Sequence, residues 1–261
     1  MKLGMPTLVE FSDIEDNYLL CSKLGLDFVE LNMNLPECNP ESLKYKDILE
    51  HKRKYNIDFA IHLPEELDLS SIHSPIRRGH LHRCKEAIDW ANRSEIKIIN
   101  MHLNQGVYFT LPDRKVWIYE KHDKLFQENL LDSYSELYEY ASSRGVRLCI
   151  ENTCNFQLHF VKEALLQLST FDDFSLTWDT GHDAKAGFME EPILQDHQNR
   201  IHHMHLHDYN GKRDHQTLYT GCVPVNSRLE FAKERGISVV VEVKTADALE
   251  ESIKNIRNLW K

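Results

Sequence analysis

The sequence predicts a (β/α)8 barrel, the TIM-barrel architecture, as a single domain over residues 1–261. Eight short apolar runs rich in β-branched residues alternate along the chain with eight amphipathic segments. Their spacing averages about 33 residues, which is the size of one strand–helix unit. The chain length is also close to the roughly 250 residues typical of such barrels. A doubly wound sheet is the alternative, disfavoured because no glycine-rich phosphate-binding turn follows the first strand.

The strands are predicted from short apolar runs bounded by polar or turn-forming residues. In chain order they are Leu3–Pro6, Phe28–Asn32, Phe59–Leu63, Ile98–Leu103, Val146–Asn152, Phe174–Asp179, His203–Asp208 and Val239–Val243. The helices are predicted from apolar residues recurring at helical spacing. They are Asp13–Leu24, Leu43–Tyr55, Arg77–Asn92, Lys124–Arg144, Val161–Leu168, Ile193–Asn199, Val225–Arg235 and Ala246–Trp260. Gly25, Gly145 and Gly236 stand just past three of these helices, where a left-handed cap favours glycine.

Two connections are longer than the rest, 64–75 after the third strand and 104–123 after the fourth. The second carries Tyr108, Phe109, Trp117 and Tyr119. Long connections at the carboxyl ends of barrel strands often cover the active site. These aromatic residues fit such a lid and equally fit the barrel rim or an interface in a homo-oligomer, and the sequence does not choose between them.

Composition limits the partners. The net charge of −10 repels nucleic acid unless a local basic groove or a bound metal intervenes. No apolar run is long enough to span a membrane, and the first residues do not form a signal peptide. The six cysteines are irregularly spaced, without a Cys-x-x-Cys pair, so we expect reduced thiols and a cytoplasmic protein.

Metal-type ligands stand at or near the ends of the predicted strands, which meet at one mouth of a barrel. They are Glu30, His62, His102, Glu151, Asp179 with His182, His205 with His207, and Glu242. Any one of them could be an ordinary polar residue at the mouth, but so many on successive strands indicate a site. On the seventh strand the period of two puts His203, His205 and His207 on one face, with His203 deeper and His207 at the rim. His205 therefore has the best depth for a ligand.

The carboxylates require a counter-charge. Glu151, Asp179 and Glu242 are expected close to the barrel axis, and two carboxylates ~5 Å apart repel by roughly 3 kcal/mol at an effective dielectric of about 20. Lys244 is the one basic residue placed to help. A divalent cation is the simplest resolution, and an Asp followed three residues later by a His, across a Thr180–Gly181 turn, suits such an ion.

These residues resemble the xylose isomerase-like TIM-barrel superfamily over essentially the whole chain. It includes sugar and sugar-phosphate isomerases and epimerases, and apurinic/apyrimidinic nucleases of the endonuclease IV type. The matching segments are Ile61–Pro64, Met101–Leu103, Ile150–Thr153, Trp178–His182, Met204–Asp208 and Val241–Lys244. As an ordered set they are specific to the superfamily but not to one activity.

The epimerase branch implies that Glu151, Asp179, His205 and Glu242 bind one divalent cation, Mn, Mg, Co or Zn. It also implies that Glu151 and Glu242 are the acid/base pair and that His182 contacts substrate. The metal would stabilise an enediolate while a carboxylate removes the adjacent proton. His62, His102, His182 and His215 are expected to line the pocket, where they position substrate or bind a second ion. For His62 and His102, hydrogen bonding within the mouth is the alternative.

The nuclease branch, with its three zinc ions, is the alternative. Its first zinc matches His62, His102 and Glu151, and its third matches His182 with an Asp-x-His pair. Here Arg213 stands where that Asp is expected, although His215 is present, and the histidine of the nuclease's first strand is absent. With the acidic surface and the short connections after the first two strands, this favours a metal-dependent isomerase or epimerase of a small sugar, sugar phosphate or related keto compound.

Overall fold

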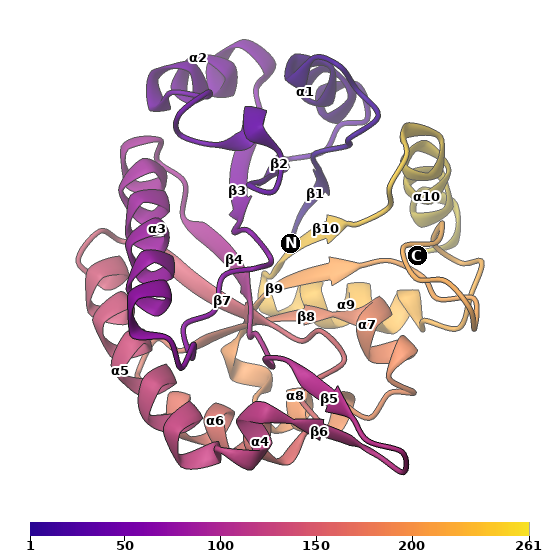
Figure 1. Cartoon of the computed structure of the whole chain (residues 1–261). Coiled ribbons are helices and arrows are strands. Elements are labelled where there is room, and N and C mark those ends of the chain that lie inside the picture. Colours follow the sequence, from indigo (N-terminus) through magenta and orange to yellow (C-terminus); the bar gives the residue numbers. More distant parts are fainter. Residues whose placement is uncertain (261) are drawn as a thin grey trace.

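Eight parallel strands close into a barrel in the computed structural model, which describes residues 1–260 (Figure 1). Around the barrel the order is β1-β10-β9-β8-β7-β4-β3-β2, so barrel strands consecutive in the chain are neighbours. The barrel strands are β1 (Lys2–Pro6), β2 (Phe28–Asn32), β3 (Asp58–His62), β4 (Ile98–His102), β7 (Arg147–Glu151), β8 (Ser175–Asp179), β9 (Ile201–Leu206) and β10 (Ser238–Val241). The predicted (β/α)8 architecture is confirmed.

Helices connect the strands and surround the barrel (Figure 1). They are α1 (Ile14–Lys23), α2 (Tyr45–Tyr55), α3 (Ser74–Arg93), α4 (Ile118–Lys121), α5 (Asp123–Ser142), α6 (His159–Leu168), α7 (Thr180–Lys185), α8 (Glu191–Asp196), α9 (Val225–Arg235) and α10 (Ala246–Leu259), with 3-10 turns η1 (Pro36–Cys38) and η2 (Gln198–Arg200). The glycines expected after three helices, Gly25, Gly145 and Gly236, all have positive φ, between 63° and 67°. None of the helices within residues 1–260 is both long and apolar enough to cross a bilayer.

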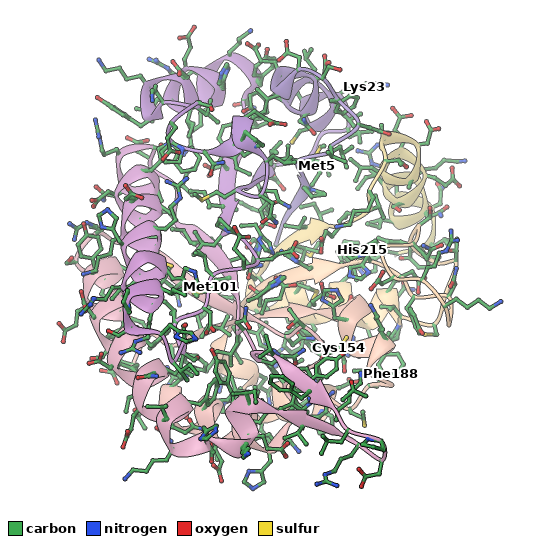
Figure 2. The ribbon with its side chains drawn as sticks, viewed as in Figure 1. Met5, Lys23, Met101, Cys154, Phe188 and His215 are labelled. Atoms are coloured by element: carbon green, nitrogen blue, oxygen red, sulfur yellow. The ribbon has the colours of Figure 1, made fainter. Side chains whose placement is uncertain are left out.

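The barrel strands are buried on both faces. Every residue of β8 is buried, because helices cover its outer side and side chains fill the ring of strands (Figure 2). Trp178 packs edge-on against Phe231 of α9, with ring centroids 5.3 Å apart, and the Arg228 guanidinium lies 4.2 Å from its ring centroid. Rigid strands held in this way can present side chains at fixed positions at the mouth.

The long connection after β4 contains secondary structure that is not predicted from the sequence. Tyr108–Thr110 (β5) and Lys115–Trp117 (β6) form an antiparallel hairpin, followed by α4. The rings of Tyr108 and Trp117 pack 4.8 Å apart across it, while Phe109 is 62% exposed. Strands of three residues are too short to show a period, so the sequence predicted only a loop.

Two local predictions at the mouth were wrong. The Thr180–Gly181 segment is the first turn of α7, because the Asp179 carboxylate caps this helix by accepting from the His182 N–H at 2.7 Å. The seventh barrel strand ends at Leu206, so Asp208 lies beyond it. There the Asp208 carboxylate accepts backbone N–H bonds from a later loop, at Thr220, Gly221 and Val223.

Candidate metal centre

Strand register brings the predicted ligands to one level of the barrel. β4 pairs with β7 so that His102 lies beside Glu151, and β8 pairs with β9 so that Asp179 lies beside His205. Glu242 comes directly after β10, at the same end of the barrel. The carboxyl ends of parallel barrel strands meet at one mouth, so residues from distant parts of the sequence become neighbours.

The four predicted metal ligands converge on one nitrogen. His205 Nδ1 lies 3.0 Å from Glu242 Oε2, 3.5 Å from Glu151 Oε1 and 3.9 Å from Asp179 Oδ2. Glu151, Asp179 and His205 are fully buried, whereas the Glu242 side chain is 13% exposed. The structure therefore brings all four residues together, with Glu242 on the side that reaches solvent.

Two of the four predicted pocket histidines surround the other oxygen of Glu151. Glu151 Oε2 lies 3.4 Å from His62 Nε2 and 3.5 Å from His102 Nε2, and the Asn100 amide also donates to it. His62 Nδ1 is hydrogen-bonded to the Leu63 carbonyl at 2.7 Å, which turns its Nε2 toward the carboxylate. These contacts fix the plane of the Glu151 carboxylate and leave its Oε1 directed at the cluster of ligands.

The other two pocket histidines lie on the solvent side. His182 Nδ1 is 3.2 Å from Asp179 Oδ2 and 3.7 Å from Glu151 Oε1, and His215 Nε2 is 3.2 Å from Glu242 Oε1. Both side chains are 17% exposed. Lys244 Nζ lies 2.8 Å from Glu242 Oε1, as its sequence position suggested. His182 and His215 thus flank the carboxylates on the side of the site that reaches solvent.

A deeper layer of polar side chains lies beneath this group. Glu30, buried on β2, reaches His203 Nε2 at 2.9 Å and His205 Nε2 at 3.0 Å, and His203 Nδ1 is 2.7 Å from Ser238 Oγ. The sequence predicts Glu30 as an acid at a strand end and His203 as the deeper histidine, but it predicts no role for either residue. For His203 the signal was the period of two along β9, and for Glu30 it was an acidic residue near the end of β2.

The sequence predicted His207 at the rim of the mouth and gave no role to Asp214. His207 is fully buried rather than at the rim, and its Nε2 contacts the Asp179 carboxylate at 3.0 Å. Asp214, one residue away from the position that the nuclease pattern requires, is 2.8 Å from Lys185 Nζ and 3.2 Å from His215 Nδ1. Its carboxylate is therefore shared between two neighbouring basic side chains.

Comparison with known proteins identifies the family. The profile of the xylose isomerase-like TIM barrel family matches residues 19–259. This chain belongs to that family. An uncharacterised relative from Methanocaldococcus jannaschii is 26% identical over 232 residues, which cover 85% of this chain and 73% of the relative.

Solved structures of other family-like barrels superpose over nearly the whole chain. A D-tagatose 3-epimerase-like protein matches with a TM-score of 0.79 and 25% identity, covering 99% of this chain and 96% of the other. The IolI protein with a bound zinc atom matches with a TM-score of 0.74 and 19% identity, covering 99% of this chain and 96% of that protein. D-psicose 3-epimerase from Clostridium cellulolyticum H10 matches with a TM-score of 0.69 and 18% identity, covering 98% of this chain and 92% of that protein. The likeness to the last two shows the fold alone.

The charges at the mouth of this xylose isomerase-like barrel stabilise one another. Burial would raise the pKa values of Glu151 and Glu242, but the neighbouring histidines, above all His205, hold both well below the usual range. Burial would lower the pKa of His205, yet Glu151, Glu30 and Glu242 raise it well above the usual value. For His182, Asp179 and Glu151 outweigh burial and raise the pKa to about 10.

Adding Mn²⁺ to metal-free protein at neutral pH should release protons. With its pKa raised, His205 carries a proton there, and a cation binding at Nδ1 must displace it. The apparent Mn²⁺ affinity should therefore rise as the pH is raised. Calorimetric titration in two buffers of different ionisation enthalpy checks this. The buffer takes up each released proton, so the observed heats of binding must differ by the difference in ionisation enthalpy for every proton released. Equal heats in both buffers would show that no proton is exchanged.

Proposed function

We propose that this chain is a divalent-metal-dependent isomerase or epimerase acting on a small sugar or related keto compound. The observation that carries the proposal is the arrangement of Glu151 and Glu242 about His205 Nδ1. They come from β7 and from the end of β10, three strands apart around the barrel. One ionised carboxylate can accept a proton from one face of a substrate carbon, and the second, once it has taken a proton from solvent, can deliver that proton to the opposite face.

The donor atoms fit a cation. Among residues 1–260, His205 Nδ1 and Glu242 Oε2 lie 3.0 Å apart as an ion pair, but both atoms are buried and the contact lacks the geometry of a hydrogen bond. Buried polar atoms are rarely left unpaired, and three carboxylates around one imidazole form a hard-to-borderline donor set suited to Mn, Mg, Co or Zn. Glu151, Asp179, His205 and Glu242 would hold the ion. His182 with His215 provides nitrogen donors for a substrate or a second ion.

The cation, when bound, would act as a Lewis acid that stabilises negative charge developing on a substrate oxygen. The protein's own residues would transfer the proton and position the substrate. Glu151, with Oε2 fixed by three side chains, presents Oε1 as a proton acceptor. Glu242 presents the opposite carboxylate. His182 and His215 donate hydrogen bonds to substrate hydroxyl groups and hold the reacting carbon between the two acids.

The comparisons support a sugar as the substrate. Proteins of this fold include a D-tagatose 3-epimerase-like protein, a D-psicose 3-epimerase crystallised with D-tagatose, and an L-ribulose 3-epimerase. A zinc atom is bound in the IolI protein. The oxygen and nitrogen atoms of the four proposed ligands in this chain are also suited to zinc. The acidic net charge favours a small substrate over nucleic acid.

Metal-loaded protein should interconvert at least one pair of keto sugars. We would incubate the protein with Mn²⁺ in D₂O and a panel of pentuloses, hexuloses and their phosphates, and follow the reaction by NMR. Deuterium should enter the carbon that changes configuration, because the abstracted proton exchanges at the solvent-accessible mouth. An abasic duplex with zinc-loaded protein forms the second arm. Catalytic nicking of that duplex, with no sugar turned over, would overturn the proposal in favour of the nuclease.

A further inference from the structure

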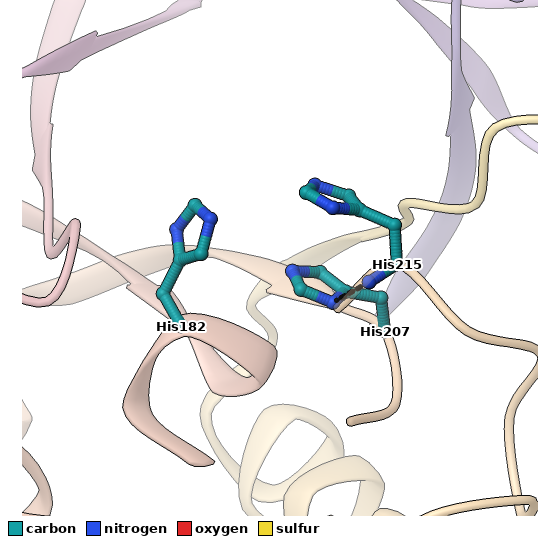
Figure 3. Close-up of side chains that lie close together, drawn as sticks. All are labelled: His182, His207 and His215. Carbon is teal, nitrogen blue, oxygen red and sulfur yellow. Dashed lines mark hydrogen bonds between the residues drawn. The ribbon is translucent and has the colours of Figure 1, made fainter. Parts of the chain in front are cut away.

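We propose that His207 is a positioning residue that ties the metal ligand Asp179 to the pocket residue His215, and that it does not itself bind a cation. The inference rests on the metal centre proposed above. His207 follows β9 and is fully buried. Three imidazoles, His182, His207 and His215, have nitrogens within 4.8 Å of one another and look like a second three-histidine metal site (Figure 3).

Hydrogen bonds fix which nitrogen of His207 carries the proton. The His215 backbone N–H donates to His207 Nδ1 at 2.8 Å, so Nδ1 must present a lone pair (Figure 3). The proton of the neutral ring is then on Nε2, which lies 3.0 Å from Asp179 Oδ1 and 3.2 Å from Oδ2. Both nitrogens are used, one as acceptor and one as donor.

This assignment removes His207 from the ligand set. To bind a cation, His207 would have to give up its hydrogen bond either to the His215 N–H or to the buried Asp179 carboxylate, and the net stabilisation of that bond would be lost. Instead it orients Asp179, as a histidine or carboxylate beneath a metal ligand commonly does. Of the three imidazoles, His182 and His215 then remain as candidates to contact a ligand.

The ring also supports the loop that carries His215. The two imidazoles stack with centroids 4.0 Å apart and 9° between their planes. His215 has φ of 53°, a left-handed conformation that residues other than glycine seldom adopt. The stack and the bond to His207 hold it there, which places His215 Nε2 3.2 Å from Glu242 Oε1.

Gly181 makes room for the same ring. A Cβ at this position would lie 2.0 Å from His207 Cε1 and Nδ1. The first turn of α7 can therefore lie directly against the imidazole only because residue 181 is glycine. This close packing excludes rotation of the ring, so the orientation of His207 is fixed from both sides.

Two conservative substitutions test the two hydrogen bonds of His207, to the His215 N–H and to Asp179, one at a time. His207→Asn keeps an acceptor near the Nδ1 position but cannot donate to Asp179, whereas His207→Gln keeps a donor near Nε2 but loses the acceptor. Mn²⁺ affinity, measured by competition with a chelator, should fall about 10- to 100-fold in His207→Asn and stay within about threefold of wild type in His207→Gln. Amide hydrogen exchange at His215 should show the reverse order, with protection lost only in His207→Gln.

Every result of these measurements either supports or contradicts the role proposed for His207. Equal Mn²⁺ affinity in wild type and both variants, or equal loss in both, would overturn the inference. If wild-type protein fails to bind Mn²⁺, the proposed function fails, while hydrogen exchange still tests the bond to His215. Should neither variant fold, ¹⁵N NMR of the His207 ring in wild-type protein decides, since a proton on Nδ1 would contradict the assigned tautomer.

Discussion

Replacing Glu151 and Asp179 together by alanine should give a folded protein that no longer retains a divalent cation. Loss of one residue that only orients a ligand lowers metal affinity about 10- to 100-fold, and loss of a direct ligand costs more. Loss of two direct ligands should therefore lower the affinity for the cation by more than about 10⁴-fold. Elemental analysis of exhaustively dialysed protein, loaded beforehand with Mn²⁺ or Zn²⁺, measures the effect.

The matched control is a second double alanine variant that removes two carboxylates far from the mouth. Asp132 and Glu139 are exposed on α5, so the double alanine variant at these positions alters net charge equally without touching the mouth. It should retain as much metal as wild type. Circular dichroism and thermal unfolding check that both variants fold. Equal metal content in the Glu151–Asp179 variant and the control would count strongly against the assigned ligand set.

The barrel could be predicted from sequence because its signal repeats. Each strand is a short apolar run and each long helix an amphipathic one, so a misplaced boundary in one unit does not change the architecture. The errors fall where this repetition stops. β5 and β6 have three residues each, and α7 has six, so neither shows a period. Their formation depends on contacts, such as the Asp179 cap on α7.

That the residues of the candidate metal centre lie close together could be predicted from a topological rule. All strands of a parallel barrel end at one mouth, so acidic and imidazole residues at the strand ends must meet there. Depth and direction could not be predicted, because they depend on register and on side-chain contacts. Thus His207 was expected at the rim, yet it is buried by Gly181 and His215. The place of Glu30 beneath His205 likewise needs the barrel geometry.

The surroundings of the two glutamates differ. Glu151 is fully buried, and three side chains contact its Oε2. Glu242 is partly exposed, and Lys244 and His215 contact its Oε1. Both have pKa values held below the usual range, so both are ionised near neutral pH and can accept a proton. We expect the proton taken by Glu242 to exchange with solvent faster, because water can reach this carboxylate.

Replacing either Glu151 or Glu242 by glutamine should lower turnover by about 10³-fold, since general acid–base catalysis contributes roughly 10²- to 10⁴-fold. Glutamine keeps the size and one oxygen of the side chain but cannot accept the proton. Each variant should therefore keep its fold and much of its metal affinity. Steady-state kinetics on the sugar identified from the panel, with metal content measured on the same samples, gives the comparison.

Deuterium exchange distinguishes the two faces of the substrate carbon. If the glutamates serve opposite faces, each glutamine variant should stop exchange into one epimer while leaving slow exchange into the other. Glu250→Gln is the control, because Glu250 is exposed on α10 and forms an ion pair with Lys23, 2.8 Å away, outside the mouth. Full activity of Glu242→Gln with metal still bound would exclude the two-glutamate scheme. A hydride shift within the substrate, or hydrolysis by metal-activated hydroxide, would then account better for these residues.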